Sequence, residues 1–268
     1  MTDELVDVLI VGAGPSGAAT AWSLSKTNLS IMCLEQGDWM DPAGYPSTQT
    51  NWETGDKSTY HVSPNIRNRA EDYPINDNDS PIAVANFNAV GGGTILYSGH
   101  FPRFHPSDFR VKTLDGVADD WPLGYANLEP FFHQNDRMMG VSGLAGDPAY
   151  PTGPAPPGGH PVALGRMGET IAKGFNKLGW HWWPSYSAII TGRPYKGRQP
   201  CVNLGPCNRG CAQGAKGSVD ITYWPVAIKN GVQLKTHARV REITIDNSGK
   251  TTGVIYYDKR GCECRQSA

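Results

Sequence analysis

The alternation of apolar and polar positions near the start of the chain predicts a strand, a helix and a second strand in immediate succession. The first apolar run covers residues 6–11 and is broken only by Asp7. Small residues then begin a predicted helix, and a second apolar run over residues 31–34 ends at Glu35. Short apolar runs separated by a helix are typical of parallel strands in an α/β fold, because such strands are buried on both faces.

Two longer helices are predicted in the middle of the chain. Asn127 is positioned as the N-cap of a helix that runs through Met139 and stops at Gly140. A second helix is predicted over residues 163–178, where apolar residues recur with a period of about 3.6. We expect the following apolar stripe to face the core: Leu164, Met167, Ile171, Phe175 and Leu178.

The last portion of the chain alternates in the manner of a β-hairpin. Residues 238–245 and 253–257 are its predicted strands, with a turn at residues 247–249. A short apolar stretch at residues 232–234 precedes the hairpin, and we expect only a polar tail after it. Residues 38–79 are polar and turn-rich without a sustained period, which predicts an irregular excursion over the surface.

The turn after the first strand carries three glycines whose spacing suits a dinucleotide. Gly12 permits the tight turn, Gly14 lets the backbone approach a pyrophosphate, and Gly17 allows close packing of helix on strand. The free N–H groups at the helix N-terminus then favour phosphate. Glu35 lies eighteen residues after Gly17, where a carboxylate accepts from ribose hydroxyls and repels a 2′-phosphate. The pattern predicts an adenine dinucleotide other than NADP and does not separate FAD from NAD; an ordinary glycine turn is the alternative.

A second glycine-rich segment occurs at residues 91–94, where three glycines precede Thr94. Backbone without Cβ atoms can come very close to a ligand, so this segment is a second candidate for ligand contact. A flexible loop is the alternative, because glycine-rich loops are common.

Composition narrows the classes of partner. The chain has 268 residues, a formal net charge of −1 and 18% charged residues, so no general attraction to nucleic acid or to an anionic membrane is expected. No stretch reaches the roughly 18 apolar residues of a membrane span, and no secretory signal precedes the first strand. We expect no direct membrane insertion and a cytoplasmic location by default, with periplasmic export alongside a partner subunit as the alternative.

Two further segments complete a pattern that extends over nearly the whole chain. Residues 120–130 read Asp-Trp-Pro-Leu-Gly-Tyr-Ala-Asn-Leu-Glu-Pro, and residues 214–218 read Gly-Ala-Lys-Gly-Ser. Together with the first glycine turn and residues 91–94, in this order, they resemble the glucose-methanol-choline (GMC) oxidoreductases. The gluconate-dehydrogenase-type flavoprotein subunits look most similar.

This resemblance implies an α/β fold with an FAD-binding Rossmann-like domain of the GMC type, incomplete at the C-terminus. The domain would comprise residues 1–45 and 215–268. Residues 46–214 would form an irregular insertion with the flavin-contacting glycine loop, a Pro/Gly-rich connector and a cysteine-containing loop. The implied FAD contacts are the pyrophosphate at Gly12, Gly14 and Gly17, the adenosine ribose at Glu35, the flavin side at Gly92, Gly93 and Thr94, and the adenine at the backbone of Val240.

The implied reaction is oxidation of a CH–OH group in a small-molecule alcohol, sugar or sugar acid, with hydride passing to flavin N5 while a base takes the hydroxyl proton. Family members keep a catalytic histidine near the C-terminus of a chain about twice as long, and none of the seven histidines here matches it. We therefore assign no catalytic residue. We interpret the chain as the truncated cofactor-binding portion of such a dehydrogenase, with an exposed sheet edge. A flavin-binding polypeptide without turnover is the alternative, and an NAD-linked dehydrogenase is disfavoured.

Three cysteines, Cys201, Cys207 and Cys211, lie in a glycine- and proline-rich loop that also holds Arg198 and Arg209. They can converge on one point, and the arginines would stabilise thiolates. Three interpretations stay open: an iron–sulfur cluster, a disulfide or reactive pair, and buried structural cysteines. The resemblance implies the first, a 3Fe-4S cluster that relays electrons to a cytochrome or small-subunit partner. The other cysteines have no expected chemistry: Cys33, in a buried strand, and Cys262 and Cys264, in the tail.

Overall fold

The computed structural model describes residues 5–55, 58–67, 69 and 71–268, which form two compact units. The first unit holds both ends of the chain and the second is built mainly from its middle. Residues 46–98 and 204–212 group with the first unit, and residues 99–203 make up most of the second. The units consist of residues 1–98, 204–212 and 218–268, and of residues 99–203 and 213–217.

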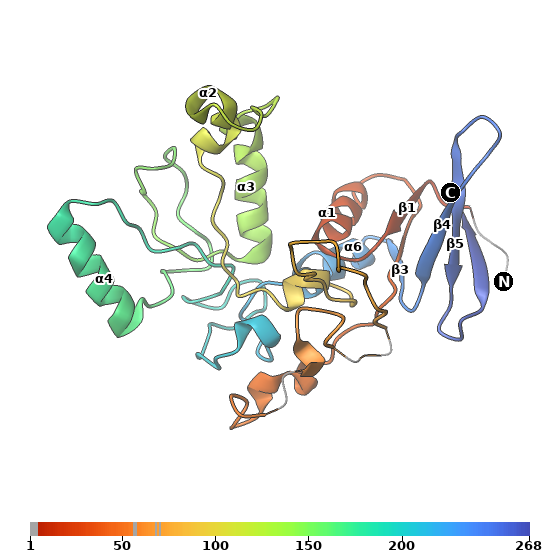
Figure 1. Ribbon diagram of the computed structural model, residues 1–268, viewed down its shortest axis with the longest axis horizontal. Helices are drawn as coiled ribbons and strands as arrows, with labels where there is room; N and C mark the ends of the chain where they lie inside the picture. Colours follow the sequence, from red (N-terminus) through yellow and green to blue (C-terminus); the bar gives the residue numbers. More distant parts are fainter. Residues whose placement is uncertain (1–4, 56–57, 68, 70) are drawn as a thin grey trace. The chain divides into compact units, whose positions relative to one another are not determined.

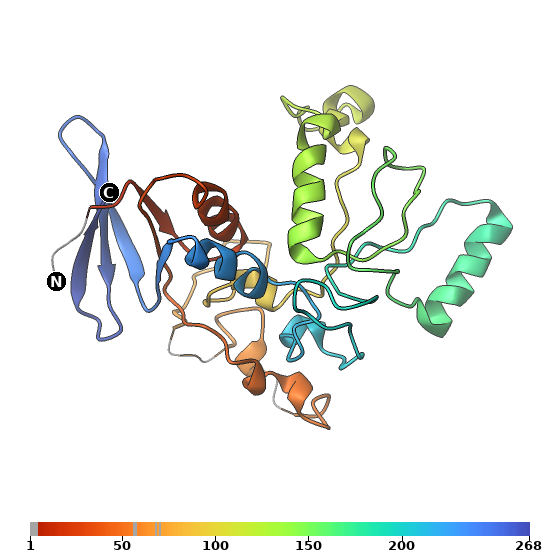
Figure 2. The ribbon, with the colours of Figure 1, turned by 180° about the vertical axis from the view of Figure 1, so that it is seen from behind.

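A parallel sheet forms the base of the first unit (Figure 1). Its strands are β1 (Val8–Val11), β2 (Ile31–Leu34) and β3 (Gln233–Lys235), with β2 in the centre. Helices α1 (Pro15–Leu24) and α6 (Trp224–Lys229) lie side by side next to this sheet (Figure 2). This arrangement confirms the predicted Rossmann-like α/β fold. In β1, Val11 is 54% exposed.

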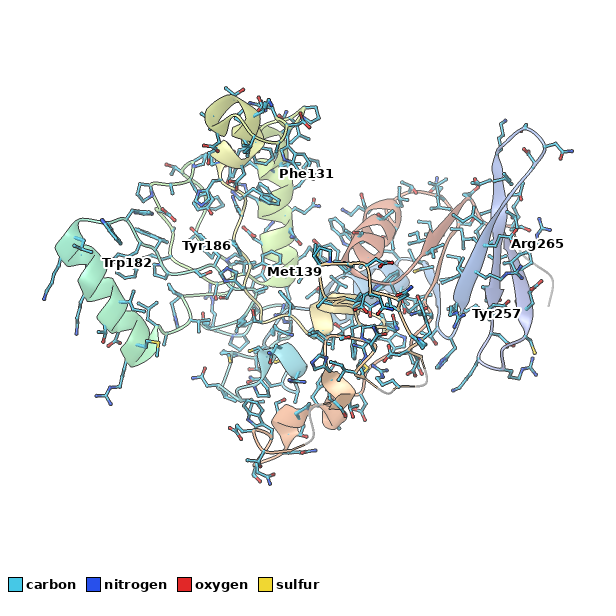
Figure 3. All side chains as sticks on the ribbon, viewed as in Figure 1. Phe131, Met139, Trp182, Tyr186, Tyr257 and Arg265 are labelled. Carbon is cyan, nitrogen blue, oxygen red and sulfur yellow. The ribbon has the colours of Figure 1, made fainter. Side chains whose placement is uncertain are left out.

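An antiparallel sheet completes the first unit. Strands β4 (Arg239–Ile245) and β5 (Thr251–Tyr257) form the predicted hairpin. The prediction of a polar tail after it was wrong, because β6 (Glu263–Ser267) pairs with β5 as a third strand. The alternation in β6 is hidden because its buried position is the polar residue Gln266, which lies between exposed Arg265 and half-buried Ser267. Figure 3 shows Tyr257 of β5 and Arg265 of β6 on this sheet.

The two sheets share an apolar core. Leu34 of β2 packs with Ala238, Val254 and Tyr256, and Val240 and Cys264 lie partly buried against this cluster. Cys33 is fully buried, as predicted, and burial raises the pKa of its thiol to about 12. The thiolate is therefore not formed near neutral pH, so Cys33 is a structural residue.

The irregular segment after β2 was predicted correctly. Its described residues form only short 3-10 turns, which are η1 (Pro42–Gly44), η2 (Pro46–Thr48) and η3 (Ser58–Tyr60). After this segment the chain returns to the end of β2, where Ala89 forms a parallel bridge with Asp38. A second apolar cluster stabilises it, made of Tyr45, Phe87, Ala89, Ile95 and Leu96.

The second unit contains η5 (Pro106–Arg110), α2 (Val111–Asp115), α3 (Tyr125–Met139) and α4 (Gly165–Leu178). The predicted helix stop at Gly140 is confirmed by its left-handed φ of 71°. The predicted N-cap was wrong, because Gly124 is the N-cap and Asn127 lies within the first turn. The amide of Asn127 still caps the helix, since its Oδ1 accepts from the Gly124 N–H at 2.9 Å.

Helix α4 exists as predicted, but its apolar stripe does not face a core. Met167 is 78% exposed and Leu178 is 61% exposed, whereas Ala172 is the buried residue of the helix. Trp182 lies beside α4 (Figure 3), with its Nε1–H donating to Asn176 at 2.8 Å. Periodicity identifies an apolar face but not the element that covers it. In the part of the chain that the structure describes, no helix is long and apolar enough to cross a membrane.

Candidate cofactor site

The first glycine turn connects β1 to α1 with the geometry that its spacing predicts. Gly12 has a φ of +93°, which glycine adopts without strain. A Cβ on Gly17 would lie 2.1 Å from the carbonyl oxygen of Gly12, so only glycine allows this approach of helix and turn. By contrast, a Cβ on Gly14 would meet no atom within 4 Å. Packing within the protein therefore explains Gly17, and it does not explain Gly14.

The N-terminus of α1 offers backbone donors beside this open position. Gly14 is the N-cap, no side chain caps the helix, and Pro15 follows as the first helical residue. The first N–H groups of a helix have no partner within the helix, and the helix dipole favours negative charge there. Together with the open Cβ direction of Gly14, this end of α1 fits a pyrophosphate.

Glu35 lies at the carboxyl end of β2 and is 6% exposed. Its Oε2 accepts from the N–H of Ala13 at 2.7 Å, and its Oε1 accepts from the N–H of Gly37 at 2.9 Å. The carboxylate is thus held against the glycine turn. A carboxylate has about four acceptor positions, so two protein donors leave acceptors for a pair of ribose hydroxyls.

The second glycine segment forms the 3-10 turn η4 (Gly92–Ile95) and packs directly on the first one. The N–H of Gly91 donates to the carbonyl of Ala13 at 3.0 Å. Gly92 has a φ of +52°, and its Cβ would lie 3.0 Å from Cα of Gly14. A Cβ on Gly93 would meet nothing within 4 Å. The structure therefore brings together the two segments that the sequence singled out.

Thr94 fixes the shape of this second segment. Its hydroxyl donates to the carbonyl of Gly91 at 2.6 Å and accepts from the N–H of Val219 at 3.1 Å. Val219 begins the short helix α5 (Val219–Thr222). This pair of hydrogen bonds ties the loop to a segment more than a hundred residues away in the chain.

Three residues of the site were missed by sequence reasoning. Gly37 donates to Glu35, and its position two residues after the acidic residue is the one signal that could have found it. Trp224 donates through Nε1 to the carbonyl of Ala13 at 2.9 Å. Asp220 is buried beside Gly91. No local pattern marks Trp224 or Asp220, because their partners are distant in sequence.

Val240 lies in β4, where it pairs with Tyr256 of β5. The preceding residue, Arg239, lines a concave surface next to the end of β2. His237, in the β3–β4 connection, has a φ of 52°, and its Nε2 lies 2.9 Å from Oδ2 of Asp38. Burial acts to raise the pKa of Asp38, but hydrogen bonds from the Trp39 N–H and from His237 outweigh it, so that pKa is lowered. The surface encloses about 680 Å³ and is lined by Gln36, Asp38, Glu71, His237, Arg239, Tyr257, Asp258, Lys259 and Gly261.

Two of the histidines contact polar side chains within the second unit. His100 Nδ1 lies 2.9 Å from the hydroxyl of Ser185, and His181 Nε2 lies 3.0 Å from Asp147. The buried Nε2 of His133 lacks a hydrogen-bond partner within the described chain. No histidine is assigned as a catalytic base.

The three loop cysteines do not all belong to the same compact unit. Cys201 belongs to the second unit, whereas Cys207 and Cys211 belong to the first. Among the described residues, no set of three or more histidine, cysteine or acidic side chains could hold a metal ion. The guanidinium of Arg198 donates to three backbone carbonyls, those of Met139, Gly214 and Ala215. The structure therefore does not support the predicted 3Fe-4S cluster.

Comparison with known families agrees with this geometry. Residues 10–74 match the family described as NAD(P)-binding Rossmann-like domain, and residues 169–267 match the family described as GMC oxidoreductase. The second match covers β3 to β6 and the segment that contributes Val219 and Trp224. This match agrees with the resemblance of the sequence motifs to the GMC oxidoreductase family.

Curated relatives are similar in sequence to most of this chain. It is 41% identical over 259 residues to a 2-methyl-1,2-propanediol dehydrogenase from Mycolicibacterium austroafricanum, which covers 96% of this chain and 46% of the relative. It is 27% identical over 269 residues to the fructose dehydrogenase large subunit from Gluconobacter japonicus, covering 94% and 48%. The chain thus spans about half the length of the curated relatives it matches.

Solved structures agree on the fold. Pyridoxine 4-oxidase from Mesorbium loti matches with a TM-score of 0.59 at 18% identity, covering 98% of this chain and 48% of that one. A fungal aryl-alcohol oxidase matches with a TM-score of 0.59 at 14% identity, covering 100% and 45%. At such low identity these matches establish the fold alone.

Proposed function

We propose that the first unit binds FAD and is the cofactor-binding portion of an oxidoreductase that acts on CH–OH groups. The observation that carries this proposal is the contact between the two glycine segments. Gly92 packs on Gly14 while the Cβ directions of Gly14 and Gly93 stay open. An acceptor, Glu35, lies at the end of the adjacent strand. A single glycine turn would suit any adenine dinucleotide, whereas the second segment extends the site toward a larger group.

Each part of the site has a proposed role. Gly12, Gly14 and Gly17, with the N-terminus of α1, hold the pyrophosphate. Glu35 accepts from the adenosine ribose, and the Val240 backbone meets the adenine. Gly92, Gly93 and Thr94 contact the flavin side, where the hydroxyl of Thr94 keeps the loop fixed through Gly91 and Val219.

When bound, the flavin supplies hydride acceptance from an alcohol carbon. The residues of this chain hold and orient the cofactor and keep negative charge at the ribose, and none of them is proposed as the base. The dehydrogenase names of the relatives support alcohols, sugars or sugar acids as the substrate class. A second candidate function of this chain is flavin binding without turnover.

Titration of the purified chain with FAD, NAD⁺ and NADP⁺ tests the cofactor assignment. We expect FAD to bind most tightly, with quenching of flavin fluorescence. NADP⁺ should bind weakest, because the carboxylate of Glu35 repels a 2′-phosphate. Glu35→Gln removes this charge and should narrow the preference for NAD⁺ over NADP⁺. Preference for NAD⁺ over FAD would contradict the proposal.

An electron relay at Cys201, Cys207 and Cys211 is a separate proposal that rests on the family resemblance. Relatives named as a large subunit and as a flavoprotein support a further subunit as partner. A cytochrome partner rests on the family resemblance alone. Anaerobic purification followed by iron analysis tests the cluster. About three iron atoms per chain, lost in a Cys207→Ser variant, are expected of a 3Fe-4S cluster. Iron-free protein that retains flavin would overturn the relay and leave the FAD proposal intact.

A further inference from the structure

Arg67 is a buried charge in the irregular segment after β2, and it has a full set of partners. Its side chain is 0% exposed, and its Nε and Nη2 each donate to one carboxylate oxygen of Asp72 at 2.7 Å. Nη1 donates to the carbonyls of His61, at 2.6 Å, and Asn86, at 2.8 Å. The guanidinium also lies 4.7 Å from the centre of the Phe87 ring. A buried guanidinium with a bidentate carboxylate is among the strongest directional contacts in proteins.

These contacts converge on the segment that leads into the second glycine loop. Arg67 binds the backbone of Asn86, and Asp72 accepts from the side-chain amide of Asn88 at 2.7 Å. On its other side, this segment runs against the end of β2. The N–H of Val90 donates to the carbonyl of Asp38 at 3.1 Å. A Cβ on Gly37 would lie 2.1 Å from the carbonyl oxygen of Asn88.

We propose that Arg67 is a positioning residue for the flavin-side glycine loop. It clamps residues 86–88 against the end of β2, so that Gly91 reaches Ala13 and Gly92 reaches Gly14 in one fixed register. This inference rests on the proposed FAD site. It goes beyond that site by assigning a role in cofactor geometry to a residue that neither glycine motif contains.

The proposal separates two halves of the cofactor. The adenosine and pyrophosphate half meets the first glycine turn and Glu35, which are held by β1, β2 and α1. The flavin half meets residues 92–94, whose approach depends on the Arg67 clamp. ADP contains the first half without the flavin, so loss of the clamp should weaken FAD binding and spare ADP binding. A substitution that merely destabilises the unit would weaken both ligands alike.

The test compares FAD and ADP affinities of the 268-residue chain with those of Arg67→Lys, Arg67→Ala and Asn88→Ala. Lysine keeps the charge but cannot make the two parallel hydrogen bonds to Asp72. Arg69→Ala is the matched control, because Arg69 lies over the same Phe87 ring at 4.8 Å but pairs with Glu71. Asn88→Ala removes the two hydrogen bonds that this side-chain amide donates, to Asp72 and to the Glu71 carbonyl, and keeps the buried ion pair. It therefore remains informative if Arg67→Ala does not fold.

We expect Arg67→Lys to raise the Kd for FAD at least about tenfold, and Asn88→Ala to raise it about threefold, with ADP affinity changed less than about twofold. The visible circular dichroism of bound flavin should change in both variants and not in Arg69→Ala. Equal losses for FAD and ADP, or unchanged FAD affinity in Arg67→Lys, would overturn the positioning role. A wild-type chain that binds ADP but not FAD would instead refute the proposed function.

Discussion

Gly14→Ala is expected to weaken FAD binding about a hundredfold, which corresponds to roughly 2.7 kcal/mol, while the folded state keeps its stability. The backbone of Gly14 has φ −71° and ψ −172°, which alanine adopts readily. The added methyl group meets no protein atom within 4 Å. It would occupy the space through which the pyrophosphate passes. Stability should stay unchanged or rise by about 0.4–1 kcal/mol, because alanine restricts the unfolded chain.

Fluorescence titration with FAD measures the predicted loss of affinity. Thermal unfolding of the same preparations without ligand measures the stability of the folded state. Gly174→Ala in α4 is the matched control, because that Cβ also meets nothing within 4 Å and the residue belongs to the second unit, outside both glycine segments. It should leave FAD affinity unchanged. FAD binding by Gly14→Ala with wild-type affinity would show that the pyrophosphate does not lie over the N-terminus of α1.

Gly17→Ala is expected to have the largest effect on folding. Its Cβ would lie 2.1 Å from the carbonyl oxygen of Gly12, a backbone atom that cannot rotate away. The start of α1 would have to move off the β1 turn, at a cost of about 4 kcal/mol or more. For a chain of this size, that cost lowers the unfolding midpoint by about 10 °C.

Differential scanning calorimetry of Gly17→Ala measures this loss, with Gly14→Ala as the control three residues away. Gly37→Ala should behave like Gly17→Ala, because its Cβ would lie 2.1 Å from the carbonyl oxygen of Asn88. An unfolding midpoint equal to that of the wild type would mean that the turn and α1 are not packed as tightly as described here.

Sequence reasoning predicted those site residues whose geometry is determined by neighbouring positions in the chain. Gly12, Gly17 and Glu35 lie within a single strand–helix–strand unit, so their spacing alone constrains their geometry. The hairpin that carries Val240 was predicted from strand alternation and turn residues. Family resemblance was needed to connect residues 91–94 with the first turn. The structure gives that link a physical form, in the packing of Gly92 on Gly14.

The residues that sequence reasoning missed depend on contacts between distant segments. Trp224 donates to Ala13 across 211 positions of sequence, and no periodicity encodes such a pair. Arg67 looks like an ordinary surface charge in a polar loop until Asp72 and Asn86 are seen around it. Strand β6 was read as a tail because Gln266 is a polar residue on a buried face.

The prediction that the apolar stripe of α4 faces the core was wrong for a different reason. The apolar positions were identified correctly, and the helix formed where expected, but Met167 and Leu178 are exposed. A periodic pattern reports which face of a helix is apolar, and whether that face is buried depends on the rest of the molecule.

The flavin content of the purified chain tests the central claim most directly. The chain is expressed, separated by gel filtration in buffer without added cofactor, and denatured, and the released nucleotide is identified and quantified by chromatography. We predict FAD, in a ratio approaching one molecule per chain for the wild type and near zero for Gly14→Ala. Folded wild-type protein that releases no flavin, and that still binds none when FAD is added, would contradict the assignment of these glycine segments to FAD.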